Sequence, residues 1–233
     1  GIPLPESAAS LDVRFMAERP DPSLRLMARI RDSNNRYHSY TLGPLARMDF
    51  LDNVDGPEWL LGSTSFFNPG KWWKEPLTLI SIGIHADSHA NPMQRGSILI
   101  DHISSGRLDV FKSDQGFKDI RVLTEVIEPF NDLNGWSVMR LNPGTRNDQL
   151  SGSGEIRFSW GGTDAMISHG LLPGETVPPI PVLASDGLLK SGGYRLGERF
   201  DISIAGRTVS LEIVDSVAMF PTLNPRTDRF VVA

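Results

Sequence analysis

The sequence contains no cysteine, which excludes disulfide bonds, thiolate metal sites, iron–sulfur clusters and cysteine nucleophiles. It also lacks a basic excess: 23 Lys and Arg residues stand against 28 Asp and Glu, and the net charge of −5 argues against a nucleic-acid partner. The longest apolar run, residues 77–84, is far shorter than the ~20 residues that cross a bilayer. We therefore expect this chain by itself to be water-soluble.

Motifs of common enzyme classes are missing as well. There is no P-loop, no G-x-G-x-x-G and no G-x-S-x-G nucleophile elbow. Acidic pairs such as Asp12 with Glu18 have the spacing of solvated loops rather than that of glycosidase carboxylates. We expect a chain that is not an enzyme and that carries no cofactor.

The two ends suggest an excised piece of a larger protein. Residues 1–10 have neither the basic nor the apolar segment of a signal peptide, and we expect them to be a linker or the end of the piece. The chain begins without Met and stops at residues 230–233, inside a segment with strand character. The last unit is therefore expected to be truncated at its C-terminus.

A two-residue alternation of apolar and polar side chains dominates what is present. In residues 24–31, four apolar residues share one face and arginines share the other, which predicts a half-buried antiparallel strand. Turn residues 32–35 and a second alternating run at 37–42 complete a predicted hairpin. Further strands are expected at 13–17, 77–85 and 97–103.

These patterns predict a mainly β chain in three parts. Short strands separated by Gly, Pro and Asn favour a jelly-roll-like antiparallel β-sandwich over residues 11–112. A polar break after Lys112, followed by strands at 120–127 and 155–160, indicates a second β unit over 113–175.

Residues 176–233 are expected to form a small α+β unit. Ser185 or Asp186 is suited to cap a short helix that Gly192 and Gly193 would end. Apolar residues then alternate from 200 to 204 and from 209 to 213 around a turn at 205–207, which predicts a hairpin.

One cluster has the composition of a metal site. His85, Asp87 and His89 form an H-x-D-x-H pattern, and on an extended chain all three side chains project to the same side. The simpler interpretation is a polar exit from a strand, because no fourth ligand is evident. We keep the three residues as weak metal-ligand candidates.

A second cluster is aromatic. Trp59, Phe66, Phe67, Trp72 and Trp73 fall within one stretch that contains Gly and Pro and that we expect to be a loop. Exposed aromatic rings of this kind stack on sugars or contact proteins, whereas ordinary core packing is the alternative. These five residues are our candidates for contact with a partner or ligand.

The C-terminal part resembles a known family through the order of its motifs. A strand at 181–185 leads to a short helix, then to Leu196-Gly197-Glu198, then to a hairpin and a strand that ends in Phe220-Pro221-Thr222-Leu223. This order resembles the extracytoplasmic region of FtsX-like, MacB-type permeases of bacterial ABC transporters. Four further segments resemble the jelly-roll insertions of the same permeases: 40–45, 76–80, 96–103 and 128–136.

The resemblance implies a non-enzymatic domain outside the membrane. In such a permease a cytoplasmic ATPase subunit drives membrane helices, and the extracytoplasmic domain couples that motion to extrusion of a substrate or activation of a partner. The implied partners are the ATPase, through a membrane part not included here, and an extracytoplasmic protein or a glycan. The alternative from another class is a carbohydrate-binding β-sandwich module of a secreted enzyme, and a metal-dependent hydrolase is weaker still.

Overall fold

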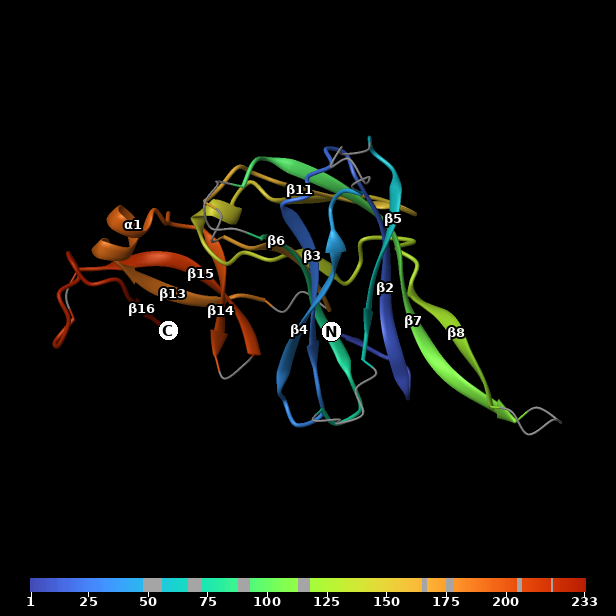
Figure 1. The fold of residues 1–233 in the computed structure, drawn as a ribbon. Coiled ribbons are helices and arrows are strands. Elements are labelled where there is room, and N and C mark those ends of the chain that lie inside the picture. The colour runs from blue at the N-terminus through green and yellow to red at the C-terminus, as the bar shows by residue number, and fades with distance from the viewer. Residues whose placement is uncertain are drawn as a thin grey trace. The chain divides into compact units, whose positions relative to one another are not determined.

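The computed structural model describes residues 1–47, 56–66, 73–87, 93–112, 118–164, 167–174, 178–204, 207–218 and 220–233. The fold is mainly β, with 56% of residues in strands, as the alternating sequence pattern predicts. The chain forms two compact units, and Figure 1 labels their elements. Unit 1 comprises Gly1–Val138 and Asp148–Glu175, and unit 2 comprises Met139–Asn147 and Thr176–Ala233.

Sheet A of unit 1 has the strand order β4-β3-β6-β12-β9, with β1 paired to β6. Its strands are β1 (Ile2–Pro3), β3 (Leu24–Arg31), β4 (Tyr37–Pro44), β6 (Thr78–Ala86), β9 (Trp136–Val138) and β12 (His169–Pro173). The predicted hairpin is confirmed, because β3 pairs antiparallel with β4 and places Arg31 opposite Tyr37. Apolar residues of β3 alternate into the core, as the sequence pattern requires.

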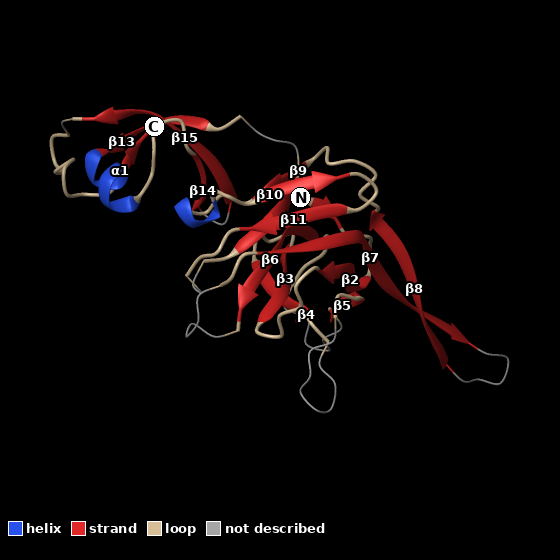
Figure 2. Cartoon of the chain, turned by 90° about the horizontal axis from the view of Figure 1, so that it is seen from above, coloured by secondary structure: helices blue, strands red, loops and turns tan. Residues whose placement is uncertain are grey.

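Sheet B of unit 1 has the order β10-β11-β7-β2-β5, with β8 paired to β7. Its strands are β2 (Ala8–Ala17), β5 (Trp59–Ser65), β7 (Gly96–Lys112), β8 (Lys118–Glu128), β10 (Gln149–Gly152) and β11 (Ile156–Trp160). The long strand β7 pairs with β11 near its start, with β2 along its middle and with β8 near its end. Beyond Arg107, β7 pairs with β8 in a two-stranded ribbon that Figures 1 and 2 show extending past the rest of the sheet.

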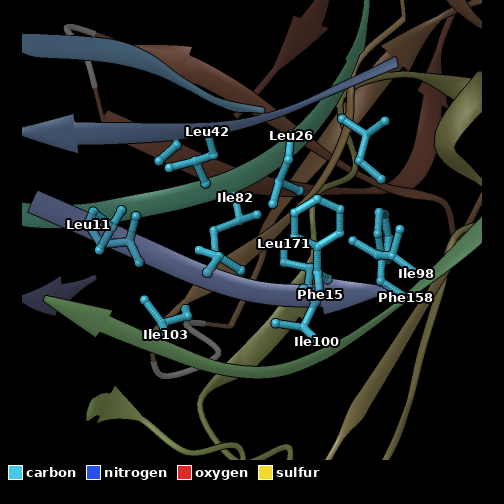
Figure 3. Packing of buried hydrophobic residues seen from close by; sticks show 14 of the residues in the cluster. Leu11, Phe15, Leu26, Leu42, Ile82, Ile98, Ile100, Ile103, Phe158 and Leu171 are labelled. Carbon is cyan, nitrogen blue, oxygen red and sulfur yellow. The ribbon is translucent and has the colours of Figure 1, made fainter. Parts of the chain in front are cut away.

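The core of unit 1 lies between the two sheets, as in a β-sandwich. Leu11, Phe15 and Phe158 from sheet B share one buried cluster with Leu26 and Ile82 from sheet A, and Figure 3 shows these side chains facing one another. Each of these five residues is at most 2% exposed. Burial of this apolar surface is the main force that holds the sheets together.

Unit 2 is built on a small sheet of order β14-β15-β13-β16. Its elements are the 3-10 turn Pro143–Thr145, β13 (Ile180–Ser185), α1 (Asp186–Gly192), β14 (Arg199–Ile204), β15 (Arg207–Val217) and β16 (Val231–Val232). β13 pairs parallel with β15, whereas β14 and β16 pair antiparallel with their neighbours. A separate cluster of Val182, Ala184, Phe200, Leu211 and Ile213 forms its core.

The buried Ser185 organises the start of α1. Its hydroxyl accepts a hydrogen bond from the Leu188 N–H at 3.1 Å, which makes it the N-cap, and donates to the Asp228 carbonyl at 2.6 Å. Gly193 ends the helix in the left-handed region, at a φ of 76°. The predicted helix and its caps are confirmed, and the hydroxyl also ties the segment after residue 223 to the helix.

The short segment 139–147, which we call the strap, belongs to unit 2 although its neighbours in sequence belong to unit 1. Arg146 in the strap donates to both carboxylate oxygens of Glu198, at 2.8 and 2.7 Å from Nη2. The Arg140 N–H donates to the Asp201 carboxylate at 2.7 Å, and Asp201 is only 6% exposed. Paired Arg and carboxylate groups of this geometry fix the strap on unit 2.

The structure differs from two sequence expectations. Residues 113–175 do not form a unit of their own, because β8, β10 and β11 extend sheet B, and β9 and β12 extend sheet A. Residues 129–135, within the segment 128–136 whose resemblance to a jelly-roll insertion implies an opening strand, form a turn between β8 and β9 instead. Glu128 stabilises this turn by accepting from the Phe130 N–H at 2.8 Å and from Trp136 Nε1 at 3.1 Å. Unit 2 contains the expected last unit, 176–233, but it also includes Met139–Asn147 from the middle of the expected second β unit.

Asp32 closes the turn between β3 and β4, and its side chain is buried. Burial alone would raise the pKa of Asp32, but hydrogen bonds from the backbone N–H groups of Arg36, Lys74 and Asn34, together with His38, outweigh it and lower the pKa. Asp32 therefore contributes stability above the pKa of an unfolded aspartate, about 3.9, and this contribution is lost as pH falls through the folded value.

We predict that Asp32→Asn lowers the free energy of unfolding at pH 7 by on the order of 1 kcal/mol. The deficit should shrink as pH falls below about 3.9, because the carboxyl group of the unfolded chain then takes up a proton while that of the folded protein, whose pKa is lower, still stays ionised. Urea unfolding at pH 3 and pH 7 measures this difference in the free energy of unfolding. Asp132→Asn is the control, because Asp132 is exposed and accepts a similar hydrogen bond from the Asn134 N–H at 2.8 Å. An equal loss in the free energy of unfolding of Asp32→Asn at pH 3 and pH 7 would contradict a stabilising role of the ionised Asp32 carboxylate.

Candidate functional site

The solvent-facing side of sheet B carries an apolar stripe between polar rows. Strand register places Trp59 beside Met16, Met16 beside Leu99, and Leu99 beside Arg157, across four neighbouring strands. The alternate residues of β2, among them Val13 and Phe15, point into the core. We call this solvent-facing side the outer face of sheet B.

Trp59 is fixed on this face by a chain of charged groups. The Arg14 guanidinium lies over the Trp59 ring, 5.0 Å from its centroid, and Arg14 Nη1 is 2.8 Å from Asp101 Oδ2. The same carboxylate oxygen is 2.9 Å from His102 Nδ1. Because Arg14 covers one side of the ring, at most the other side of Trp59 is open to a ligand.

A second polar group lies at the end of the outer face where β2 finishes. Glu18 accepts hydrogen bonds from Arg157, at 2.6 Å, and from the Ser97 hydroxyl. The Glu18 N–H donates to the Ser97 carbonyl at 3.0 Å, which continues the pairing of β2 with β7. These contacts balance the charges of Glu18 and Arg157 within the face.

The outer face thus combines one partly exposed ring, apolar side chains and paired charges on a rigid sheet. Leu61, next to Trp59 on β5, adds a large apolar side chain that is 63% exposed. Surfaces with aromatic and aliphatic groups among hydrogen-bonding groups bind proteins or sugars by contact. The face offers recognition chemistry, and we take it as the candidate functional site.

The structure separates the aromatic residues that the sequence grouped. Trp59 lies in strand β5 rather than in the expected loop, and its ring is partly exposed. Phe66 is 2% exposed and packs edge-on against Tyr40 at 5.2 Å, so the contact role expected for Phe66 is wrong. Trp73 packs partly buried against the core, while Phe67 and Trp72 lie outside the described residues.

His85 and Asp87 take different partners on sheet A. His85 Nδ1 lies 3.1 Å from the Ser168 hydroxyl, whereas Asp87 pairs with Arg25 on β3. Burial lowers the pKa of His85, and the neighbouring His169 lowers it further. His89 lies outside the described residues, and in the part of the chain that is described no group of three or more His, Cys, Asp or Glu is arranged to hold a metal.

Sequence reasoning missed a buried polar cluster in unit 1. His169 on β12 is fully buried, with Nδ1 2.7 Å from Asp148 Oδ2 and Nε2 2.8 Å from the Thr163 hydroxyl. A carboxylate, an imidazole and a hydroxyl in this order resemble a catalytic triad, but the buried imidazole has no access to a substrate. Both ring nitrogens have partners, so the cluster ties β12 of sheet A to the segments that flank β10 and β11 of sheet B.

No local signal could have revealed this cluster. Asp148 and His169 are 21 residues apart, and each is preceded by loop-like sequence. The strand register that joins β12 to β6 brings His169 inside, and that register is set by long-range packing.

No model of a known protein family matches the chain, and neither a curated protein nor a solved structure matches it. Among the residues that the structure describes, no helix has the length and apolar character needed to span a membrane.

We predict that Asp148→Ala destabilises the protein by about 2 kcal/mol or more, because it leaves the buried His169 ring without its acceptor. Asp148→Asn keeps an acceptor at this position and should cost less. Urea unfolding followed by tryptophan fluorescence measures both variants.

Asp87→Ala is the matched control, because it removes a carboxylate from the more exposed pair with Arg25 and should cost under about 1 kcal/mol. If Asp148→Ala and Asp87→Ala cost the same, the buried cluster does not tie the sheets together. If Asp148→Ala does not fold, the loss in the free energy of unfolding of Asp148→Asn is compared with that of Asp87→Ala instead.

Proposed function

We propose that the chain is a non-enzymatic extracytoplasmic domain of a bacterial ABC transporter permease of the FtsX-like, MacB-type kind. In this proposal unit 1 is a jelly-roll-like insertion and unit 2 is the small permease core. The domain couples movement of membrane helices, driven by a cytoplasmic ATPase, to extrusion of a substrate or activation of a partner. It works by shape and movement, without forming or breaking a covalent bond.

The observation that carries the proposal is the order of elements in unit 2. β13, α1, β14 and β15 follow one another in the order on which the family resemblance rests, and together they enclose one core. The Phe220-Pro221-Thr222-Leu223 segment belongs to the same unit, where Phe220 bridges to Leu223 and its ring lies 5.4 Å from Phe230. The motifs therefore belong to one folded body, as a permease core requires.

The connection between the units also supports a role in transmitting movement. The chain passes from one unit to the other at three places, after Val138, after Asn147 and after Glu175. Several covalent links transmit displacement better than a single flexible linker, whose ends move independently. The strap between the first two links is fixed on unit 2 by Arg146 and Glu198.

We predict that the complete protein, produced from its own gene, sediments with membranes and co-purifies with an ATPase subunit. Protease added outside intact spheroplasts should cut within this chain, while a cytoplasmic marker enzyme stays uncut. Recovery of the complete protein in the soluble fraction, or protection of the chain from external protease, would overturn the proposal.

The outer face of sheet B favours a second candidate, a carbohydrate-binding module of a secreted enzyme. The specific observation is Trp59, whose ring is held by Arg14 beside the hydrogen-bonding groups Asp101 and His102. Sugar rings stack on partly exposed indoles of this kind.

If the face binds sugars, a panel of neutral polysaccharides should change the tryptophan fluorescence in a saturable way. Trp59→Ala should remove this response, whereas Trp73→Phe, at a ring that packs against the core, should leave it in place. A flat response across the panel rejects the carbohydrate module and leaves the permease proposal as it stands.

A further inference from the structure

An open cavity of ≈ 490 Å³ lies in unit 1 where three strands meet. Glu18 and Arg19, which directly follow β2, lie beside it, β7 begins there at Gly96, and β11 ends there at Trp160. The strand order β11-β7-β2 makes these ends neighbours. The volume falls within the range of pockets that hold small molecules.

Two arginines give the cavity a positive charge. Arg19 and Arg95 both line it, both are exposed, and no described residue forms an ion pair with either. The carboxylate in the lining, Glu18, is already neutralised by Arg157 at 2.6 Å. The cavity therefore carries two uncompensated positive charges in a chain whose net charge is −5.

The rest of the lining consists of two serines, a glycine and a tryptophan. Ser159 contributes a hydroxyl group, the Ser97 hydroxyl donates to Glu18 and keeps its lone pairs, and the lining contains no aliphatic side chain. Trp160 is fixed at the edge of the cavity, because Nε1 donates to the Gln94 carbonyl at 2.9 Å and its ring packs in the core, where a Cβ on Gly96 would be only 2.4 Å away. Hydroxyls beside arginines suit a ligand that carries its own hydroxyl groups and an oxyanion.

We propose that this cavity binds a polyhydroxylated organic acid of about the size of a sugar acid. Arg19 and Arg95 bind its carboxylate, and its hydroxyl groups bind to the Ser159 hydroxyl and to the lone pairs of Ser97 Oγ, whose proton is donated to Glu18. A simple oxyanion would leave most of the 490 Å³ to water, whereas a neutral sugar would leave both arginines uncompensated. This site stands apart from the permease proposal, because it rests on the cavity and its charges alone.

Titration of the 233-residue chain with D-glucuronate, D-glucose and acetate tests the proposal. The backbone N–H resonances of Ser97 and Ser159 in ¹⁵N-correlated NMR spectra are the readout, since both residues line the cavity. We expect a saturable shift with glucuronate at millimolar concentrations, about tenfold weaker binding of acetate and no shift with glucose. Raising the salt from about 50 to 300 mM should weaken glucuronate binding.

The double variant Arg19→Ala/Arg95→Ala should weaken glucuronate binding at least tenfold, which corresponds to about 1.4 kcal/mol. The matched control Arg47→Ala/Arg226→Ala removes two exposed arginines elsewhere and should bind as the parent does. The proposal is overturned by an unchanged response in the Arg19/Arg95 variant, by an equal response to glucose, or by no response to glucuronate up to about 20 mM. Acetate binding as tight as that of glucuronate would overturn the assignment to a sugar acid.

Discussion

The hydrogen bonds around His169 are the constraint on which unit 1 depends. Apolar packing holds the two sheets together, but it has no direction and permits them to slide. The buried imidazole of His169 restricts this sliding, because any shift that separates it from Asp148 or Thr163 leaves a polar atom unpaired in the interior. One short line of polar atoms thus fixes β12 of sheet A against the ends of β10 and β11 in sheet B.

Much of the fold follows from short-range sequence signals. The alternation of apolar and polar residues at 24–31 predicts β3, because one face of that strand is buried and the other faces solvent. Ser185 and Gly193 mark the ends of α1 because capping chemistry is local. β5 is not predicted, because an exposed apolar Leu61 and a buried Gly62 interrupt the alternation of apolar and polar residues. The extension of β7 to Lys112 is not predicted either, because it depends on pairing with β8.

The candidate sites were less accessible to sequence reasoning. The residue type alone makes Trp59 a candidate contact residue, whereas only the structure shows that Arg14 of a neighbouring strand lies over its ring. Phe66 has the same aromatic character and is buried, so residue type without burial does not separate contact from core. Arg19 and Arg95 are 76 positions apart in the sequence (95 − 19), and only the pairing of β2 with β7 brings them to one cavity.

The strap has a consequence for how this polypeptide can be divided. Neither unit is a continuous stretch of sequence, so no single cleavage of the backbone frees either of them. A gene fragment that encodes only 176–233 would leave Glu198 and Asp201 without the arginine side chain and the backbone N–H that face them. Recombination that moved one unit into another protein would have to carry both of its segments, and the two units are therefore expected to be inherited together.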